Sequence, residues 1–335
     1  MSEQRAGGRR RGAWRLRLTA GAVALSALAA GCTEYGGNLS GTTASEGSGD
    51  TVVVSETAGV PMAFLSYGVR RGHFDDQGIT LELRASSGGA TVIPALLSED
   101  IDVAGSNVVS AMIAMGRRMP VTMVTAGTSA ADRAEDDFSS IMVAEDSPVE
   151  EPEDLEATRV AVNTLQNIND VAIHSAMTDR GVDARGIDFV EMPLPDMPAA
   201  IQRGDVDAGL LIEPFASIGR SQGLRDVVRP YTDLRSGLQI GTYLMTTRTV
   251  GDRPELVDAF QAGVAATAED VARDPEAFRD ALPEISDLDP ELAARMNLPR
   301  WSGATDRESI EAVHAVMVDI GLTDAELDFG EAAVG

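Results

Sequence analysis

The sequence contains one cysteine, no lysine and few aromatic residues. Because Cys32 has no second cysteine to pair with, an intrachain disulfide is excluded. The 27 residues that carry a fixed positive charge are all arginines, and 53 aspartates and glutamates outnumber them, so the formal net charge is −26. A chain this acidic repels nucleic acid and anionic lipid surfaces at long range. We therefore expect no nucleic-acid partner.

Signatures of catalysis are also missing. The three histidines, His73, His174 and His314, are far apart, and none is paired with a carboxylate at the spacing of metal ligands. The chain has no G-x-S-x-G turn, no G-x-x-x-x-G-K-[ST] phosphate loop and no G-x-G-x-x-G after its first strand. Acidic residues are abundant, but no pattern selects a pair for acid–base chemistry. We therefore expect no enzymatic activity, no bound metal and no cofactor.

The N-terminal segment is typical of an export signal. An arginine-rich head precedes an uncharged stretch, Leu18–Ala30, which is shorter than the roughly 20 apolar residues that span a bilayer. The run Leu28-Ala29-Ala30-Gly31-Cys32 resembles a lipobox, in which small residues enter a protease groove and the thiol takes a diacylglyceryl group. An ordinary signal peptide with a chance cysteine is the alternative, and Arg10-Arg11 leaves the twin-arginine export route open. We expect residues 1–32 to be a lipoprotein signal peptide and Cys32 to be the lipidation site, with the chain at the outer face of the cytoplasmic membrane.

A tether follows the predicted anchor. Residues 33–50 are mostly Gly, Ser and Thr, and such a segment buries too little apolar surface to fold. It therefore predicts a flexible link of a few tens of ångströms at most. No second long apolar run follows it, so we expect no other membrane span.

Beyond the tether, short apolar runs alternate with helical patterns. Such alternation predicts parallel sheets covered by helices. After Arg253 the pattern is entirely helical, which predicts two α/β lobes with a helical C-terminal portion. The predicted strands are 51–55, 79–84, 101–105, 121–126, 140–144, 159–163, 187–192, 206–212 and 239–246. The predicted helices include 90–98, 169–180, 197–203, 214–222, 254–273, 275–282, 290–296 and 307–320.

Small polar residues follow several of these strands. In open α/β sheets ligands bind just past the carboxyl ends of strands, where backbone N–H groups and helix N-termini favour anions. The segments in question are Ser86–Gly89, Gly105–Asn107 and Asn163–Asn167. Each one alone is also explained by helix capping, because Ser and Asn are favoured N-caps. Their equivalent positions in both halves favour a cleft.

An ordered series of motifs resembles the nitrate/sulfonate/taurine-type substrate-binding proteins of ABC importers, which are close in fold to the thiamine-pyrimidine-precursor binders. The resemblance runs from Thr51 to about Leu327, and its most specific run ends in Glu213-Pro214-Phe215 after a strand. The other motifs are Phe74–Leu83, Ser87-Gly88-Gly89, Pro94–Leu97, Asp102–Gly105, Pro152–Leu155, Arg159–Val162 and Ala200–Ala208.

The resemblance implies a type II periplasmic-binding-protein fold with two α/β lobes, a hinge and an interlobe cleft. Lobe I is expected to combine residues 51–139 and 239–335, and lobe II to comprise residues 140–238. A solute that contacts both lobes shifts an open–closed equilibrium, and the closed form is presented to the permease. The implied partners are a small solute, an ABC permease with its ATPase, and the membrane through the lipid anchor. We expect a monomer.

Site residues follow from the same resemblance. Ser87, Gly88 and Gly89 are expected to be the principal anion donors, and Glu213 either receives an amino group of the ligand or caps the helix that starts at Pro214. The remaining expected wall residues are Thr57, Ala58, Gly59, Met62, Ser106, Asn107, Thr125, Asn163, Thr164 and Gln166.

The solute is expected to be small and not a sugar. Sugar sites usually stack rings on Trp or Tyr, and Trp301 is the one tryptophan outside the N-terminal leader. A sulfonate- or taurine-like solute is favoured, because local N–H donors outweigh a distant field screened within about 8 Å. Nitrate and an amino-bearing thiamine-pyrimidine precursor are alternatives. So are a binding module that reports to a sensor and a pyrimidine-synthase-like enzyme, although the cysteine-rich segment of such enzymes is absent.

Overall fold

The computed structural model describes residues 50–324 and residue 327. The predicted signal peptide, Cys32 and the tether up to residue 49 lie outside the described residues. Within the described part, no helix is long and apolar enough to cross a membrane.

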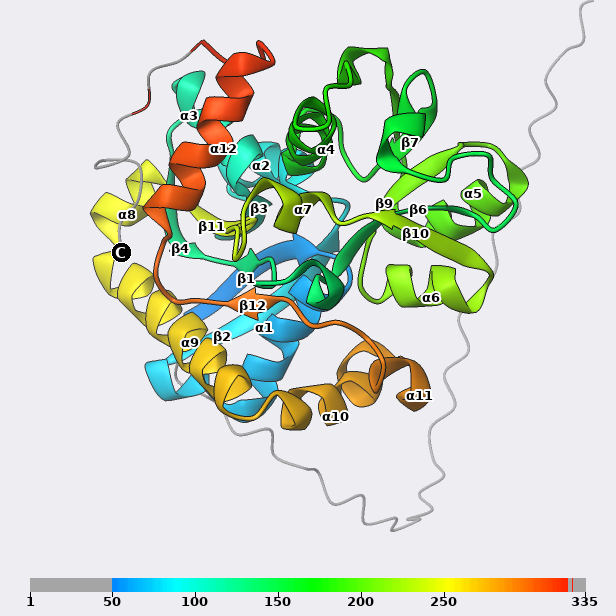
Figure 1. Ribbon diagram of the computed structural model, residues 1–335. Coiled ribbons are helices and arrows are strands. Elements are labelled where there is room, and N and C mark those ends of the chain that lie inside the picture. The colour runs from blue at the N-terminus through cyan, green and yellow to red at the C-terminus, as the bar shows by residue number, and fades with distance from the viewer. Residues whose placement is uncertain (1–49, 325–326, 328–335) are drawn as a thin grey trace, which may run out of the picture. The chain divides into compact units, whose positions relative to one another are not determined.

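The first of two five-stranded sheets carries the start of the described chain (Figure 1). Its strand order is β2-β1-β3-β11-β4, in which β1 pairs in parallel with β2 and β3, whereas β11 is antiparallel to β3 and β4. Five strands form it: β1 (Asp50–Thr57), β2 (Ile79–Ser86), β3 (Val103–Asn107), β4 (Val121–Ala126) and β11 (Gly241–Thr246). We call this sheet with its helices lobe I.

Helices cover both faces of this sheet. One apolar cluster joins Val103, Val124 and Met245 to α1 (Val60–Arg71), α9 (Pro254–Arg273) and α10 (Pro275–Ser286). Successive strand side chains point to opposite faces. The neighbouring residues Ala104, Met123 and Leu244 accordingly belong to the other apolar cluster. That cluster includes buried residues of α2 (Gly89–Leu97), α3 (Val108–Gly116) and α12 (Arg307–Asp319).

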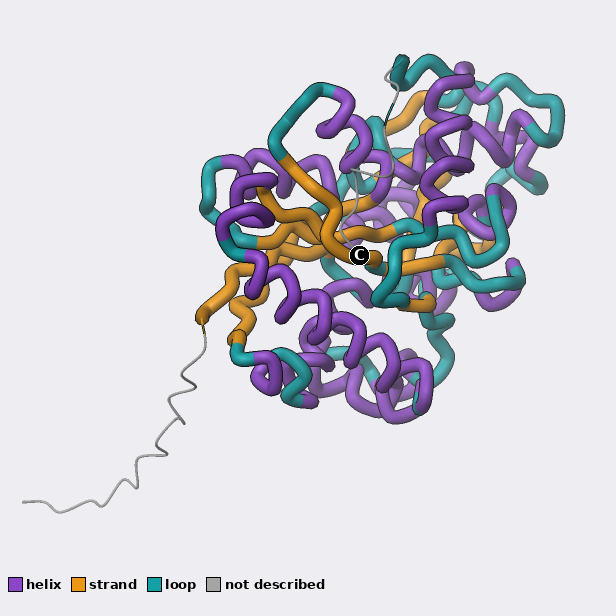
Figure 2. Tube along the Cα trace, turned by 90° about the vertical axis from the view of Figure 1, so that its left-hand side faces the viewer, coloured by secondary structure: helices purple, strands orange, loops and turns teal. Residues whose placement is uncertain are grey.

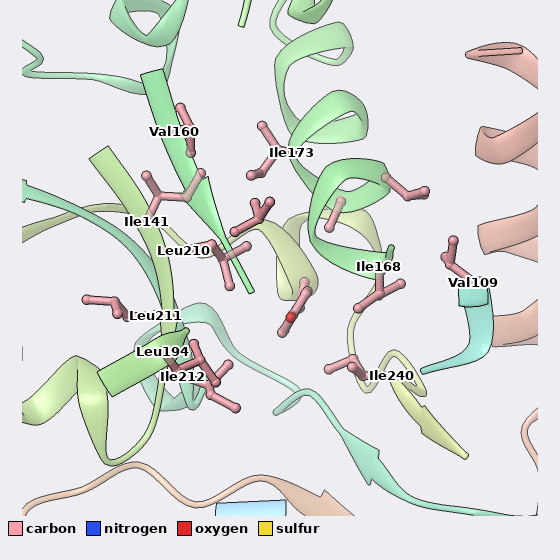
Figure 3. Close-up of a cluster of buried hydrophobic side chains, with 14 of the residues drawn as sticks. Val109, Ile141, Val160, Ile168, Ile173, Leu194, Leu210, Leu211, Ile212 and Ile240 are labelled. Carbon is pink, nitrogen blue, oxygen red and sulfur yellow. The ribbon is translucent and has the colours of Figure 1, made fainter. Parts of the chain in front are cut away.

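The second sheet, with its helices, is lobe II, and its strand order is β10-β6-β9-β7-β8. Its strands are β6 (Ser139–Ala144), β7 (Arg159–Val162), β8 (Asp188–Glu191), β9 (Ala208–Ile212) and β10 (Leu224–Val228). Figure 3 shows Ile141, Val160 and Leu210 projecting toward Ile173 of α4 (Ile168–Thr178). The opposite face carries α5 (Met197–Arg203) and α6 (Phe215–Ser221), which pack on β6 and β9.

The chain crosses between the two sheets twice, after β4 and after β10. The crossings include β5 (Thr128–Ser129), which pairs with β12 (Arg300–Trp301), and α7 (Pro230–Leu234). The remaining helices are α8 (Thr247–Asp252) and α11 (Pro290–Ala293). Figure 2 shows the strands lying among layers of helices. Two α/β lobes joined by two crossing segments confirm the predicted fold class, while the residue boundaries of the lobes stay a prediction.

Candidate functional site

A cavity lies where the carboxyl ends of strands from both lobes meet. Its empty space, with open solvent at its mouth included, is about 550 Å³. Lobe I contributes Glu56, Thr57, Pro61, Gly89, Ser106, Asn107 and Gly241. Lobe II contributes Asn163, Asn167, Ile168, Asn169, Leu194 and Ile212, and the crossing segments contribute Thr128, Phe138, Tyr231 and Ile240. In Figure 3, Leu194 and Ile212 lie together, and Ile240 approaches Ile168 from the adjoining segment.

Two helices of lobe I begin at this cavity. Asn107 is the N-cap of α3, and its side-chain oxygen accepts a hydrogen bond from the N–H of Ser110 at 3.0 Å. Helix α2 begins at Gly89 with no side-chain cap and no acidic residue in its first turn. A helix N-terminus carries unpaired N–H groups and a partial positive charge. The start of α2 is therefore the lobe I feature best suited to an anion.

Lobe II presents three asparagines around the start of α4. Asn167 caps α4 by accepting from the N–H of Asn169 at 2.7 Å. The side-chain amides of Asn167 and Asn169 both donate to Asn163 Oδ1, at 2.9 and 2.8 Å, and the Tyr231 hydroxyl donates to Asn169 Oδ1. These bonds hold the asparagines in one orientation, so this wall is built before a ligand arrives.

A carboxylate, Glu56, lies in the lobe I wall of the same cavity. Its exposed fraction is 6%, and it accepts a hydrogen bond from the N–H of Thr57 at 2.6 Å. Burial raises the pKa of Glu56 to about 7, although hydrogen bonds from Thr57 and Tyr243 act to lower it. Burial likewise raises the pKa of Asp170, in the first turn of α4, to about 6. Both groups therefore change charge near neutral pH.

Two of the contacts between the lobes lie beside the cavity. The Asn163 side-chain amide donates to the carbonyl oxygen of Ser87 at 2.7 Å. On the other side, the N–H of Val60 donates to the carbonyl oxygen of Glu213 at 3.2 Å. Both contacts join a loop after a lobe I strand to the end of a lobe II strand, so the cleft is closed in this structure.

The structure brings five of the predicted site residues to the cavity: Thr57, Gly89, Ser106, Asn107 and Asn163. Ser87 and Gly88 lie at the contact with Asn163, and the Thr164 hydroxyl accepts from Asn167 at 2.7 Å. Ala58, Gly59 and Met62 line a separate, mostly apolar groove, Gln166 lines a third hollow, and the Thr125 hydroxyl donates to the carbonyl of Gly303 at 3.1 Å. Contact with a solute stays a prediction for all of them.

Glu213, another predicted site residue, is fully buried and does not line the cavity. Its carboxylate accepts from the N–H and the hydroxyl of Ser217 and from Arg220 Nη1, each at 3.0 Å. The carboxylate thus caps α6 and pairs with Arg220, which is the helix-capping alternative considered for this residue.

Sequence patterns missed several cavity residues. Glu56 directly precedes Thr57 at the end of β1, so its position could have been inferred from the strand-end argument. No sequence signal marks Phe138, Tyr231 or Ile240, because their position at the cavity depends on how the crossing segments fold. Among residues 50–324 and 327, no group of three or more His, Cys, Asp or Glu could hold a metal ion.

Comparison with known proteins identifies relatives. The family described as "NMT1/THI5 like" matches residues 61–278. A protein of Escherichia coli (strain K12), named "Putative aliphatic sulfonates-binding protein", is 30% identical over 127 residues. That alignment covers 38% of this chain and 38% of the relative, so the match spans well under half of the relative's length.

Solved structures share the fold over most of the chain. The alkanesulfonate-binding protein SsuA from Xanthomonas axonopodis pv. citri, bound to MOPS, has a TM-score of 0.71 at 16% identity, covering 85% of this chain and 98% of that one. The desulfurization enzyme DSZB has a TM-score of 0.60 at 17% identity, covering 85% and 96%. A binding protein and an enzyme both match, so these likenesses establish architecture alone. The chain belongs to the NMT1/THI5-like family and has the periplasmic-binding-protein fold.

Proposed function

We propose that this chain is the solute-binding protein of an ABC importer, which holds a small solute between its lobes and presents it to a permease without chemical change. The observation that carries the proposal is the interlobe cavity, with the start of α2 on one wall and the ordered asparagines on the other. A solute that contacts both walls stabilises the closed arrangement, and a closed arrangement is a distinct shape for a permease to recognise.

We favour a solute with a sulfonate group, as in the relatives named above. The uncapped start of α2 supports an anion there. A thermal-shift screen of sulfonates, taurine, nitrate, aminopyrimidines and amino acids tests this. A ligand at about 100 times its Kd adds about 2.7 kcal/mol of stability. If none of these compounds stabilises the protein, the proposal is wrong.

The anchor and the lobe boundaries belong to the same proposal. Diacylglyceryl modification of Cys32, with residues 33–50 as the tether, would keep the body near the permease at the outer face of the membrane. Intact-mass measurement of membrane-extracted protein checks this, because the mature chain should begin at a modified Cys32. Whether the body delivers to a permease or reports to a sensor is decided by a transport assay in vesicles with the neighbouring membrane proteins.

Ser87→Asp tests the assignment of the anion-binding loop. Ser87 is exposed and directly precedes the Gly88-Gly89 start of α2, so the variant places a negative charge beside the proposed anion position. We expect it to weaken binding of the best sulfonate about tenfold, because like charges several ångströms apart near a protein surface repel by about 1.4 kcal/mol. Calorimetric titration measures the change.

Ser87→Asn is the matched control, since asparagine has nearly the same shape and no charge. It should bind the sulfonate within about twofold of the unmodified chain. If Ser87→Asp also leaves the affinity unchanged, the assignment of this loop is wrong.

A further inference from the structure

We propose that the cavity selects a small zwitterion whose cationic amino group is received by the carboxylate of Glu56. The inference rests on the proposed sulfonate-binding function and narrows its substrate class to aminosulfonates and solutes of like charge pattern. Glu56 replaces Glu213 as the receiver of an amino group, because the carboxylate of Glu213 is already engaged by Ser217 and Arg220.

The backbone of lobe I shapes a dedicated place for Glu56. It is the next-to-last residue of β1, and a Cβ on Gly105 of the neighbouring strand β3 would lie 2.4 Å from its carboxyl carbon. The carboxyl group therefore packs directly against a glycine backbone and lines the cavity with 6% of its surface exposed. A side chain at position 105 would force the carboxyl group to shift.

The protein groups around Glu56 present it as an acceptor. The N–H of Thr57 donates to Oε1 at 2.6 Å, and the Tyr243 hydroxyl also bonds to the carboxylate. Burial, followed by the charge of Glu56, raises the pKa of Tyr243, so the phenol keeps its proton and donates it. The carboxyl group accepts from these two donors and lines the cavity, where it can also accept a hydrogen bond from a solute.

Within the described part of the chain, no arginine or histidine is paired with this carboxylate. Among the described residues that line the cavity, none is Arg, Lys or His, and the other titratable group is Tyr231. From the neighbouring elements the groups against Glu56 are Thr57 of β1, Gly105 of β3 and Tyr243 of β11, none of them positively charged. Burying an uncompensated charge is costly, and burial accordingly raises the pKa of Glu56 to about 7. A cationic group on the solute would supply the missing charge.

The sign of the pH dependence follows from this arrangement. An ammonium group binds the ionised carboxylate, so affinity for an amino-bearing solute should rise as pH increases through about 7. An anion without an amino group is repelled by the ionised carboxylate, so its affinity should fall over the same interval. The two kinds of solute therefore give opposite slopes in one protein.

Taurine and ethanesulfonate are the probes, because they share the sulfonate and differ in the amino group. Calorimetric titration of the full chain, purified from membranes in detergent, is made between about pH 5.5 and about pH 8. At the upper pH we expect taurine to bind at least about tenfold tighter than ethanesulfonate, which is the usual scale of a charge-assisted hydrogen bond. The preference should shrink toward the lower pH.

Glu56→Gln keeps the shape of the side chain and removes its charge. We expect it to abolish both the preference for taurine and the opposite pH slopes. Asp170→Asn is the matched control: burial raises the pKa of Asp170 as well, to about 6, but Asp170 does not line the cavity, so the preference should persist. The pH dependence of binding of the two sulfonates is measured on the unmodified chain. It therefore tests the role of Glu56 even if Glu56→Gln fails to fold.

Equal binding of the two sulfonates, parallel pH slopes, or an unchanged preference in Glu56→Gln would overturn the role of Glu56 and leave the sulfonate-binding function standing. Binding of neither probe at any pH would overturn that function together with the inference.

Discussion

Replacing Arg220 with Met should lower the free energy of unfolding by about 3 kcal/mol or more at about pH 8. Glu213 is fully buried, and the 3.0 Å ion pair with Arg220 is the cationic contact to its carboxylate within the described part of the chain. Arg220 also donates to both carboxylate oxygens of Asp226 at 2.9 Å. Without the guanidinium, the buried charge of Glu213 loses its counterion, while Asp226 keeps a longer, 3.5 Å pair with Arg229. Removal of one partner of a buried ion pair is the most costly kind of ion-pair loss.

The loss should be larger at about pH 8 than at about pH 5, where protonation relieves the buried charge. Burial raises the pKa of Glu213 and Arg220 opposes that rise, so removing Arg220 raises the pKa further. For a carboxyl whose pKa is higher in the folded state, stability is greatest at low pH and falls as pH rises through the folded-state value. Urea unfolding at both pH values measures the difference.

Two further variants serve as controls for Arg220→Met. Arg185→Met removes an arginine that is 85% exposed and pairs with Asp183, which is 54% exposed, and should leave the free energy of unfolding nearly unchanged. Adding Glu213→Gln to Arg220→Met should recover most of the lost stability, because no buried charge then remains. Equal losses in Arg220→Met and Arg185→Met would contradict the assignment of Glu213 as a buried charge that needs its counterion.

All nine strands predicted from the sequence are present, and eight of them contain buried apolar residues; the ninth, the edge strand β8, has only half-buried and exposed residues. Strand β10 was not predicted. It is an edge strand whose sequence LRDVV carries Arg225 and Asp226, and its polar residues are used in ion pairs and backbone contacts rather than in a core. Helix α3 was missed for the opposite reason, since a helix apolar on nearly every side shows no amphipathic period.

The sequence predicted the cavity residues that lie at the ends of strands. Ser106, Asn107 and Asn163 reach one cavity because ligand clefts form at the carboxyl ends of strands. Side chains alternate along a strand, so Ile212 faces the cavity while Glu213 is directed toward Ser217 and Arg220. Tyr231 and Phe138 could not be predicted, because the chain brings them to the cavity only through contacts between residues distant in sequence.

Gly59→Val should weaken binding of the most stabilising sulfonate about a hundredfold. Gly59 lies between β1 and α1 with φ at +106°, and a Cβ there would be 2.9 Å from the carbonyl oxygen of Glu213 and 3.3 Å from Pro214 Cδ in the other lobe. Overpacking of this kind costs up to about 3 kcal/mol. Since the clash exists only where the lobes touch, the cost applies to the closed form, and the apparent affinity falls by the same factor as the closed population.

Gly72→Val separates this clash from backbone strain. Gly72 also has a positive φ, +79°, but nothing lies within 4 Å of a Cβ built there. Both variants force a β-branched residue to a positive φ, and the loss of stability should be larger at Gly59, whose ψ of −148° lies outside the αL region that Gly72 occupies. Only Gly59→Val should lose affinity. Small-angle X-ray scattering gives a second measurement: a solute-induced decrease in the radius of gyration should occur in Gly72→Val and be absent in Gly59→Val. Similar affinities in the two variants would show that the Gly59–Glu213 contact persists when the solute leaves, and that closure takes place about a different pair of surfaces.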